Sequence, residues 1–160
     1  MIREMMMKDI IRRGDKMKKL TAILCVLCLA GCSNGGDTKT TVCTADMNGV
    51  SVTNSFESNG DEITRQTVQN EMDYTTTGYS EEEMAQIAES YRSAYDVKGV
   101  EYSYEFSGNM LIENITIDFT EADFNELMDA ELITADGENV SYISLEQTLD
   151  SLESSGFDCK

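Results

Sequence analysis

The sequence predicts a single-domain α+β fold, in which an antiparallel β-sheet built from hairpins carries about three helices packed on one face. Two observations predict this fold. Segments with alternating apolar and polar residues are separated by short Asn- and Gly-containing turns, which is typical of hairpins. Three other segments combine an N-terminal capping signal with apolar residues at helical spacing.

Five β-strands are expected, in two groups. The first group comprises residues 41–47, 50–56 and a Thr-rich strand over 63–77, with turns at Asn48-Gly49 and Asn59-Gly60-Asp61. In the second group, the turn Gly108-Asn109 joins residues 100–106 to a return strand. The apolar positions of this second pair are Val100, Tyr102, Tyr104, Phe106, Leu111, Ile115, Ile117 and Phe119.

Three helices are expected from their capping signals. Residues 80–96 begin with Ser80 and Glu83 spaced as a capping box, in which each side chain binds the backbone N–H of the other residue. The second helix is expected to start at Thr120 with Asp123, and the third at Ser144 with Gln147. The element order is therefore β-β-β-α-β-β-α-α, and no Gly-rich strand-to-helix loop indicates a nucleotide-binding fold.

Residues 17–32 have the pattern of a bacterial lipoprotein leader. Met17-Lys18-Lys19 is basic, and the apolar run that follows, over residues 20–30, is too short at eleven residues to span a bilayer as a helix. Leu29, Ala30, Gly31 and Cys32 together resemble a lipobox. We therefore expect residues 1–31 to be a cleaved signal peptide, starting at Met1 or at Met17, and the Cys32 thiol to be lipidated.

Lipidation at Cys32 would anchor the protein to the cell membrane on its extracytoplasmic side, with membrane lipid as its partner. Residues 32–41 are rich in Ser, Asn, Gly and Thr, and they are predicted to form a flexible lipidated tether. Residues 42–160 are expected to form the α+β lipoprotein domain.

The chain is strongly acidic, with 30 acidic residues, 12 basic residues and no histidine. Seven of the basic and three of the acidic residues precede Cys32, so the expected mature chain keeps five basic and 27 acidic residues, a net charge of −22. Such a charge excludes nucleic-acid binding, which requires a positive surface. It also disfavours adhesion of the protein surface to anionic lipid.

Cysteine positions predict one disulfide. Cys25 and Cys28 belong to the leader and Cys32 to the lipid anchor, which leaves Cys43 and Cys159 near the two ends of the domain. In an exported protein such a pair is expected to be oxidised, the alternative being two unpaired thiols. A metal site at these cysteines is not expected, because two thiols without histidine do not complete a zinc shell.

Several motifs are distributed along the predicted domain. They include the Asn48-Gly49 turn, Gly99-Val100-Glu101, the segment Glu-Asn-Ile-Thr-Ile-Asp at 113–118 and the closing Gly156-Phe157. Together with the lipobox, this arrangement resembles the YehR-like lipoproteins, a family with a domain of unknown function. The resemblance implies a small α+β lipoprotein domain, and it provides no catalytic residues to transfer.

No catalytic site, metal site or cofactor is expected. Histidine, the commonest general base, is missing from the whole chain, and no Gly-x-Ser-x-Gly motif is present. Two acidic clusters invite a calcium interpretation, but neither has the spacing of an EF-hand loop. These clusters are Asp118, Glu121 and Asp123, and Asp136, Glu138 and Asn139.

The aromatic residues allow two interpretations. The residues concerned are Tyr91, Tyr95, Tyr102, Tyr104 and Phe106. They either form the core between helix and sheet or line a pocket for a peptide, a sugar or a lipid. The sequence thus predicts a non-enzymatic binding or accessory lipoprotein of the cell envelope, with an envelope protein or a small ligand as partner. The alternative is a lipid-anchored envelope enzyme with an unrecognised carboxylate-based site.

Overall fold

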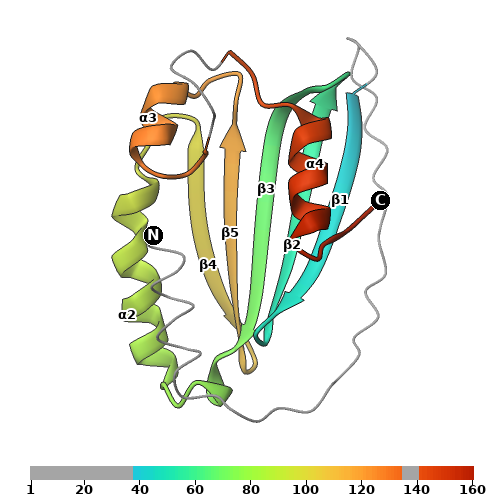
Figure 1. Ribbon diagram of the computed structural model, residues 1–160. Coiled ribbons are helices and arrows are strands. Elements are labelled where there is room, and N and C mark those ends of the chain that lie inside the picture. The colour runs from blue at the N-terminus through green and yellow to red at the C-terminus, as the bar shows by residue number, and fades with distance from the viewer. Residues whose placement is uncertain (1–37, 135–140) are drawn as a thin grey trace.

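The computed structural model describes residues 38–134 and 141–160, which contain an antiparallel β-sheet and three α-helices (Figure 1). The strands of the sheet are β1 (Thr38–Met47), β2 (Val50–Asn59), β3 (Glu62–Asp73), β4 (Val100–Ser107), β5 (Met110–Asp118) and β6 (Asp158–Cys159). The helices are α2 (Glu81–Tyr91), α3 (Phe124–Asp129) and α4 (Leu145–Ser154). The predicted α+β fold is confirmed.

The described strands form one sheet in the order β4-β5-β3-β2-β1-β6. Hairpins join β1 to β2, β2 to β3 and β4 to β5, as the turn signals predict. The pairing of β3 with β5 and of β1 with β6 brings together segments that are distant in the sequence. All strand pairings are antiparallel. Successive residues of a strand point to opposite faces of the sheet, and this alternation is interrupted in β3 by a register shift opposite Glu57 and Ser58.

All three helices contribute apolar side chains to one face of the sheet, which we call the covered face. Phe56, Ile63 and Leu127 are fully buried between β2, β3 and α3, and partly buried leucines of α4 pack against them. A second cluster joins Met84 of α2 to Leu111 of β5. In Figure 1, α4 lies over β2 and β3, while α2 runs along β4.

Some element boundaries differ from the prediction. The first strand begins at Thr38, so residues 38–41 of the predicted tether belong to the sheet. The third strand ends at Asp73, because the Asp73 carboxylate accepts the Thr75 N–H and starts a 3-10 turn. The predicted helix over 80–96 is shorter, since α2 ends at Tyr91 and residues 92–95 form another 3-10 turn.

The predicted capping box of α2 is confirmed, and at α4 the Ser144 half of the predicted capping box is confirmed. The Ser80 hydroxyl accepts the Glu83 N–H, and the Glu83 carboxylate accepts the Ser80 N–H at 2.8 Å, which completes the capping box of α2. The Ser144 hydroxyl accepts the Gln147 N–H at the start of α4. Both contacts satisfy backbone donors that have no partner within the first helical turn.

The predicted start of the second helix at Thr120 is wrong. The N-cap of α3 is Asp123, whose carboxylate accepts the N–H groups of Asn125 and Glu126. Thr120 instead donates both its N–H and its hydroxyl to Asp118 at the end of β5. A carboxylate three residues later therefore determines where the helix begins.

The turn between β2 and β3 also holds the start of α4. The Asp61 carboxylate accepts the Glu146 N–H at 2.8 Å, and the Asp61 carbonyl accepts the Leu145 N–H at 2.7 Å. The pKa of Asp61 is lowered, first by the hydrogen bond from Glu146 and then by one from Ser144. The charged form of Asp61 thus favours the docked position of the C-terminal helix.

Gly99 is constrained by a close backbone approach. Its φ is +79°, and its carbonyl accepts the Asp118 N–H at 2.8 Å. A Cβ atom at Gly99 would lie 2.9 Å from both the Asp118 carbonyl oxygen and the Ala122 nitrogen. The Gly99-Val100-Glu101 motif is therefore explained by sterics, because any larger side chain would separate β4 from the segment that follows β5.

We expect Gly99→Ala to lower the free energy of unfolding by about 3 kcal/mol, because it combines a disfavoured φ with a backbone clash. Gly78→Ala is the matched control, since Gly78 has a φ of +82° but nothing within 4 Å of the point that a Cβ atom would occupy. Gly78→Ala should lower the free energy of unfolding by about 1 kcal/mol. Urea denaturation followed by circular dichroism measures both, and equal losses would contradict the close-approach explanation.

We expect Asp61→Asn to lower stability near neutral pH and to have a smaller effect in acid. Because the pKa of Asp61 is lowered in the folded state, its contribution is present above the unfolded value near 3.8 and is lost as pH falls through the folded value. The difference in unfolding free energy between the two proteins should therefore shrink below about pH 4. A pH-independent difference in urea titrations would show that the charge of Asp61 does not matter.

Candidate functional site

The residues of the predicted lipobox, with the Cys32 that is expected to carry the lipid, lie outside the described part of the chain. These are Leu29, Ala30, Gly31 and Cys32, and the predicted turn at 136–139 lies outside it as well. The sheet begins at Thr38, six residues after Cys32. Of the helices that the structure describes, none has the length and apolarity that crossing a bilayer requires.

The predicted disulfide is present. Cys43 in β1 and Cys159 in β6 lie directly opposite each other and are joined by an S–S bond. Val42 and Lys160 flank this bond with two backbone hydrogen bonds of 2.9 Å, each donating its N–H to the carbonyl of the other. Cys43 is fully buried, so the bond lies in the core. It ties the segment that follows α4 to the first strand.

We expect reduction, or the double change Cys43→Ser and Cys159→Ser, to lower the free energy of unfolding by about 4 kcal/mol, because the bond closes a loop with a sequence separation of 116 residues. Urea denaturation with and without dithiothreitol measures this loss. The double variant provides the control, since its own stability should not respond to the reductant. A native protein that unfolds at the same urea concentration in both conditions would contradict the prediction.

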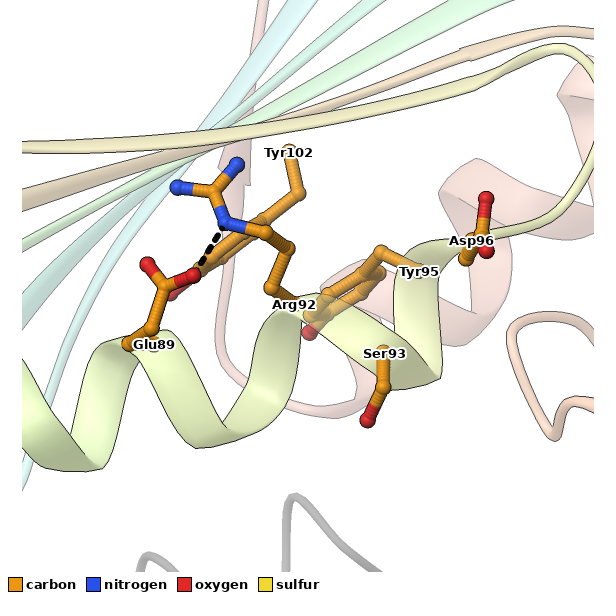
Figure 2. A pocket seen from close by; sticks show the side chains of 6 residues that line it. All are labelled: Glu89, Arg92, Ser93, Tyr95, Asp96 and Tyr102. Carbon is orange, nitrogen blue, oxygen red and sulfur yellow. Dashed lines mark hydrogen bonds and ion pairs between the residues drawn. The ribbon is translucent and has the colours of Figure 1, made fainter.

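An open cleft of about 550 Å³ lies where the end of α2 faces β4 (Figure 2). Its lining side chains come from α2, the following 3-10 turn and β4, and they are Glu89, Arg92, Ser93, Tyr95, Asp96 and Tyr102. The cleft thus contains two of the aromatic residues that the sequence singled out. Tyr74 and Phe106, by contrast, pack edge to face in the second core cluster.

Tyr102 is the central side chain of this cleft. Its ring stacks on Tyr95 with centroids 4.7 Å apart, and the Arg92 guanidinium lies 5.9 Å from the Tyr102 centroid. Its hydroxyl donates to the Glu113 carboxylate at 2.6 Å and lies 3.2 Å from the Ala88 carbonyl oxygen. Burial, followed by the contact with Glu113, raises the pKa of Tyr102, so the phenol keeps its proton at neutral pH.

Three charged side chains line the cleft, and two of them, Glu89 and Arg92, pair with each other. Arg92 donates to Glu89 at 2.8 Å, and this hydrogen bond lowers the pKa of Glu89 (Figure 2). Since both side chains are more than half exposed, the pair itself adds little stability. The contacts that join this end of α2 to β4 include the Tyr95–Tyr102 stack and the Arg92 guanidinium over the Tyr102 ring. The chemistry of the cleft is that of a packed aromatic and ionic contact.

Two members of the first acidic cluster, Asp118 and Asp123, have structural partners. Asp118 accepts hydrogen bonds from Arg65 at 3.2 Å and from Thr120, both of which lower the pKa of Asp118, with Thr120 the larger contributor. Asp123 caps α3. Over residues 38–134 and 141–160, no three His, Cys, Asp or Glu side chains are grouped so that they could hold a metal ion.

The face of the sheet opposite the covered face carries two rows of mostly uncharged polar side chains. Strand register places one row across five strands, in the order Thr44, Thr53, Gln69, Asn114 and Ser103. The adjacent row consists of Val42, Ser55, Thr67, Thr116 and Glu101. We call these two rows the hydroxyl–amide face.

Hydrogen bonds between neighbouring strands order the middle of this face. Gln69 donates to Asn114 at 3.2 Å, and the hydroxyls of Thr67 and Thr116 lie 3.3 Å apart.

Sequence reasoning missed the hydroxyl–amide face, although the polar positions of each strand were visible. The missing information was the pairing of β3 with β5, which aligns the two halves of the face.

A family model and two curated relatives match most of the chain. The family model "Protein of unknown function (DUF1307)" matches residues 37–158. The uncharacterized lipoproteins Lmo0207 of Listeria monocytogenes and Lin0239 of Listeria innocua are each 27% identical to the chain over 147 residues, which covers 88% of this chain and 95% of theirs.

Two structures solved by NMR share the fold. The YehR protein of E. coli superposes with a TM-score of 0.67 at 23% identity, covering 78% of this chain and 92% of that protein. A protein from Streptococcus pneumoniae TIGR4 superposes with a TM-score of 0.53 at 13% identity, covering 91% of this chain and 99% of that protein. The resemblance to YehR-like proteins inferred from the sequence motifs is confirmed.

Proposed function

Because the chain belongs to the DUF1307 family of proteins of unknown function, and its curated relatives are named as lipoproteins, we propose that it is a lipid-anchored protein on the extracytoplasmic side of the membrane. There it serves as a non-catalytic binding or accessory protein of the cell envelope. The observation that carries the proposal is the lipobox Leu29-Ala30-Gly31-Cys32, which precedes the first strand by only six residues.

A lipid on Cys32 would hold a defined end of the domain near the bilayer. Six extended residues span at most about 20 Å. Thr38 pairs with Asn59 at the β2–β3 turn, so this turn and the nearby start of α4 form the membrane-proximal end. The strongly acidic chain has little attraction for anionic lipid, and the acyl chains therefore supply the attachment.

Three carboxylates of the described domain take part in structural hydrogen bonds and are unsuited to acid–base catalysis. A general acid at neutral pH needs a raised carboxyl pKa, and a general base needs access to a substrate proton. Asp61, Glu83 and Asp118 instead have a lowered pKa, because each accepts hydrogen bonds at a helix start or a strand end. These carboxylates hold backbone segments in place.

We expect Cys32→Ala to abolish lipidation. Cells that express the full chain are labelled with a palmitate analogue, and the membrane fraction is tested for label and for the mature N-terminus. The native chain should be labelled, membrane-bound and cut before Cys32, whereas Cys32→Ala should be unlabelled and uncleaved.

Cys28→Ala is the matched control, because it removes a thiol from the same leader without touching the lipobox. This variant should be labelled like the native chain. Labelled Cys32→Ala protein, or a mature N-terminus at another residue, would overturn the proposed anchor.

A further inference from the structure

We propose that the hydroxyl–amide face binds a neutral polysaccharide that carries hydroxyl and N-acetyl groups. This proposal rests on the proposed function only for the location of the protein, since an anchored domain would meet such polymers outside the membrane. The first observation is one of charge. The expected mature chain has 27 acidic and five basic residues, yet nine of the ten positions that β1 to β5 contribute to the two central rows are uncharged. The charged positions lie at the two edges of the sheet, Glu101 in β4 and Asp158 of β6 beside Thr44.

Charged rows border this uncharged centre on both sides. The row toward the β1–β2 turn contains Asp46, Glu71 and Glu105, and the row toward the β2–β3 turn contains Glu57, Arg65 and Asp118. Carboxylates on both sides repel an anionic polymer. A neutral polymer can occupy the centre without removing a charge from water, and removing a charge is costly.

The side chains of the face have the hydrogen-bonding capacity of a sugar surface. Each Ser or Thr hydroxyl offers one donor and two acceptor positions, and each Asn or Gln amide offers donors and an acceptor. Hydroxyl and acetamide groups of a sugar chain present the same types of donor and acceptor. Five paired strands spaced about 4.8 Å apart form a platform about 19 Å wide, which is suited to an extended chain.

The composition of the face disfavours a protein partner. The centre of a protein–protein interface is apolar and enriched in aromatic residues. Val42 is the single apolar residue among the ten central positions. The flanking row toward the β1–β2 turn adds one more, Ile112. The aromatic residues of β4 are all on the covered face, because Tyr102, Tyr104 and Phe106 alternate with Glu101, Ser103 and Glu105.

The face is also preorganised. Thr53, Thr67, Gln69 and Asn114 lie on the central strands of the sheet and are half-buried. The Gln69–Asn114 and Thr67–Thr116 contacts hold two neighbouring pairs of side chains in place before any ligand binds. Ordering these side chains therefore costs little on binding, which compensates for the small apolar area of the contact.

The test uses the purified full chain in detergent and its co-sedimentation with insoluble chitin, a neutral polymer with hydroxyl and N-acetyl groups. Cross-linked polygalacturonate, which is anionic, serves as the comparison polymer. We expect the native protein to sediment with chitin and not with polygalacturonate. Sedimentation with neither polymer, or with polygalacturonate alone, would overturn the proposal.

Three variants locate the binding surface. The double change Thr53→Glu and Thr116→Glu places two charges in the centre and should reduce chitin binding at least tenfold. Asn114→Asp adds one charge at nearly constant shape, so it should weaken binding even if the double variant folds poorly. Ser154→Glu on the exposed side of α4 is the matched control and should bind like the native protein.

Equal chitin binding by native protein, Asn114→Asp and the double variant would overturn the proposal, as would an equal loss in Ser154→Glu. Circular dichroism verifies that each variant is folded. The purified-protein assay does not depend on the membrane anchor. Failure of chitin binding with normal labelling at Cys32 would therefore reject the polysaccharide proposal alone, whereas normal chitin binding without labelling would reject the anchor alone.

Discussion

The packing of α2, α3 and α4 against a single face of the sheet is the interaction on which the rest of this structure depends. Burial of that face excludes water from Phe56, Ile63 and Leu127, and it provides the main favourable contribution to folding. Three short helices can cover only one side of a five-strand platform. The opposite side must therefore tolerate water, and it does so with hydroxyl and amide groups.

Polar contacts then fix where each helix lies on the covered face. Asp61 holds the start of α4, the Ser80–Glu83 pair starts α2, and Asp123 starts α3. At the other end of α2, the Arg92–Tyr102–Tyr95 arrangement fixes the chain before it enters β4. The apolar layer thus supplies stability, whereas the caps and the aromatic contact determine register and orientation.

Local signals explain why much of this fold could be predicted from sequence. Asn48-Gly49 and Gly108-Asn109 define hairpins whose strands are neighbours in the chain, and Ser80 with Glu83 defines a helix start through contacts three residues apart. The pairing of β3 with β5 is different, because α2 and β4 separate them in sequence and no local pattern encodes their register. The hydroxyl–amide face depends on that pairing, so it could not be recognised in the sequence. The aromatic residues illustrate the same limit, since the contact of Tyr102 with Tyr95 and Arg92 depends on a 3-10 turn that interrupts the predicted helix.

The position of β4 at one edge of the sheet affects how neighbouring copies of the protein interact. An eight-residue edge strand offers backbone groups to which a second copy could add by strand pairing, and a membrane anchor would concentrate the copies in a plane. Glu101 and Glu105 alternate along this edge in a chain with a large negative charge. Mutual repulsion therefore opposes edge-to-edge aggregation and keeps neighbouring molecules apart.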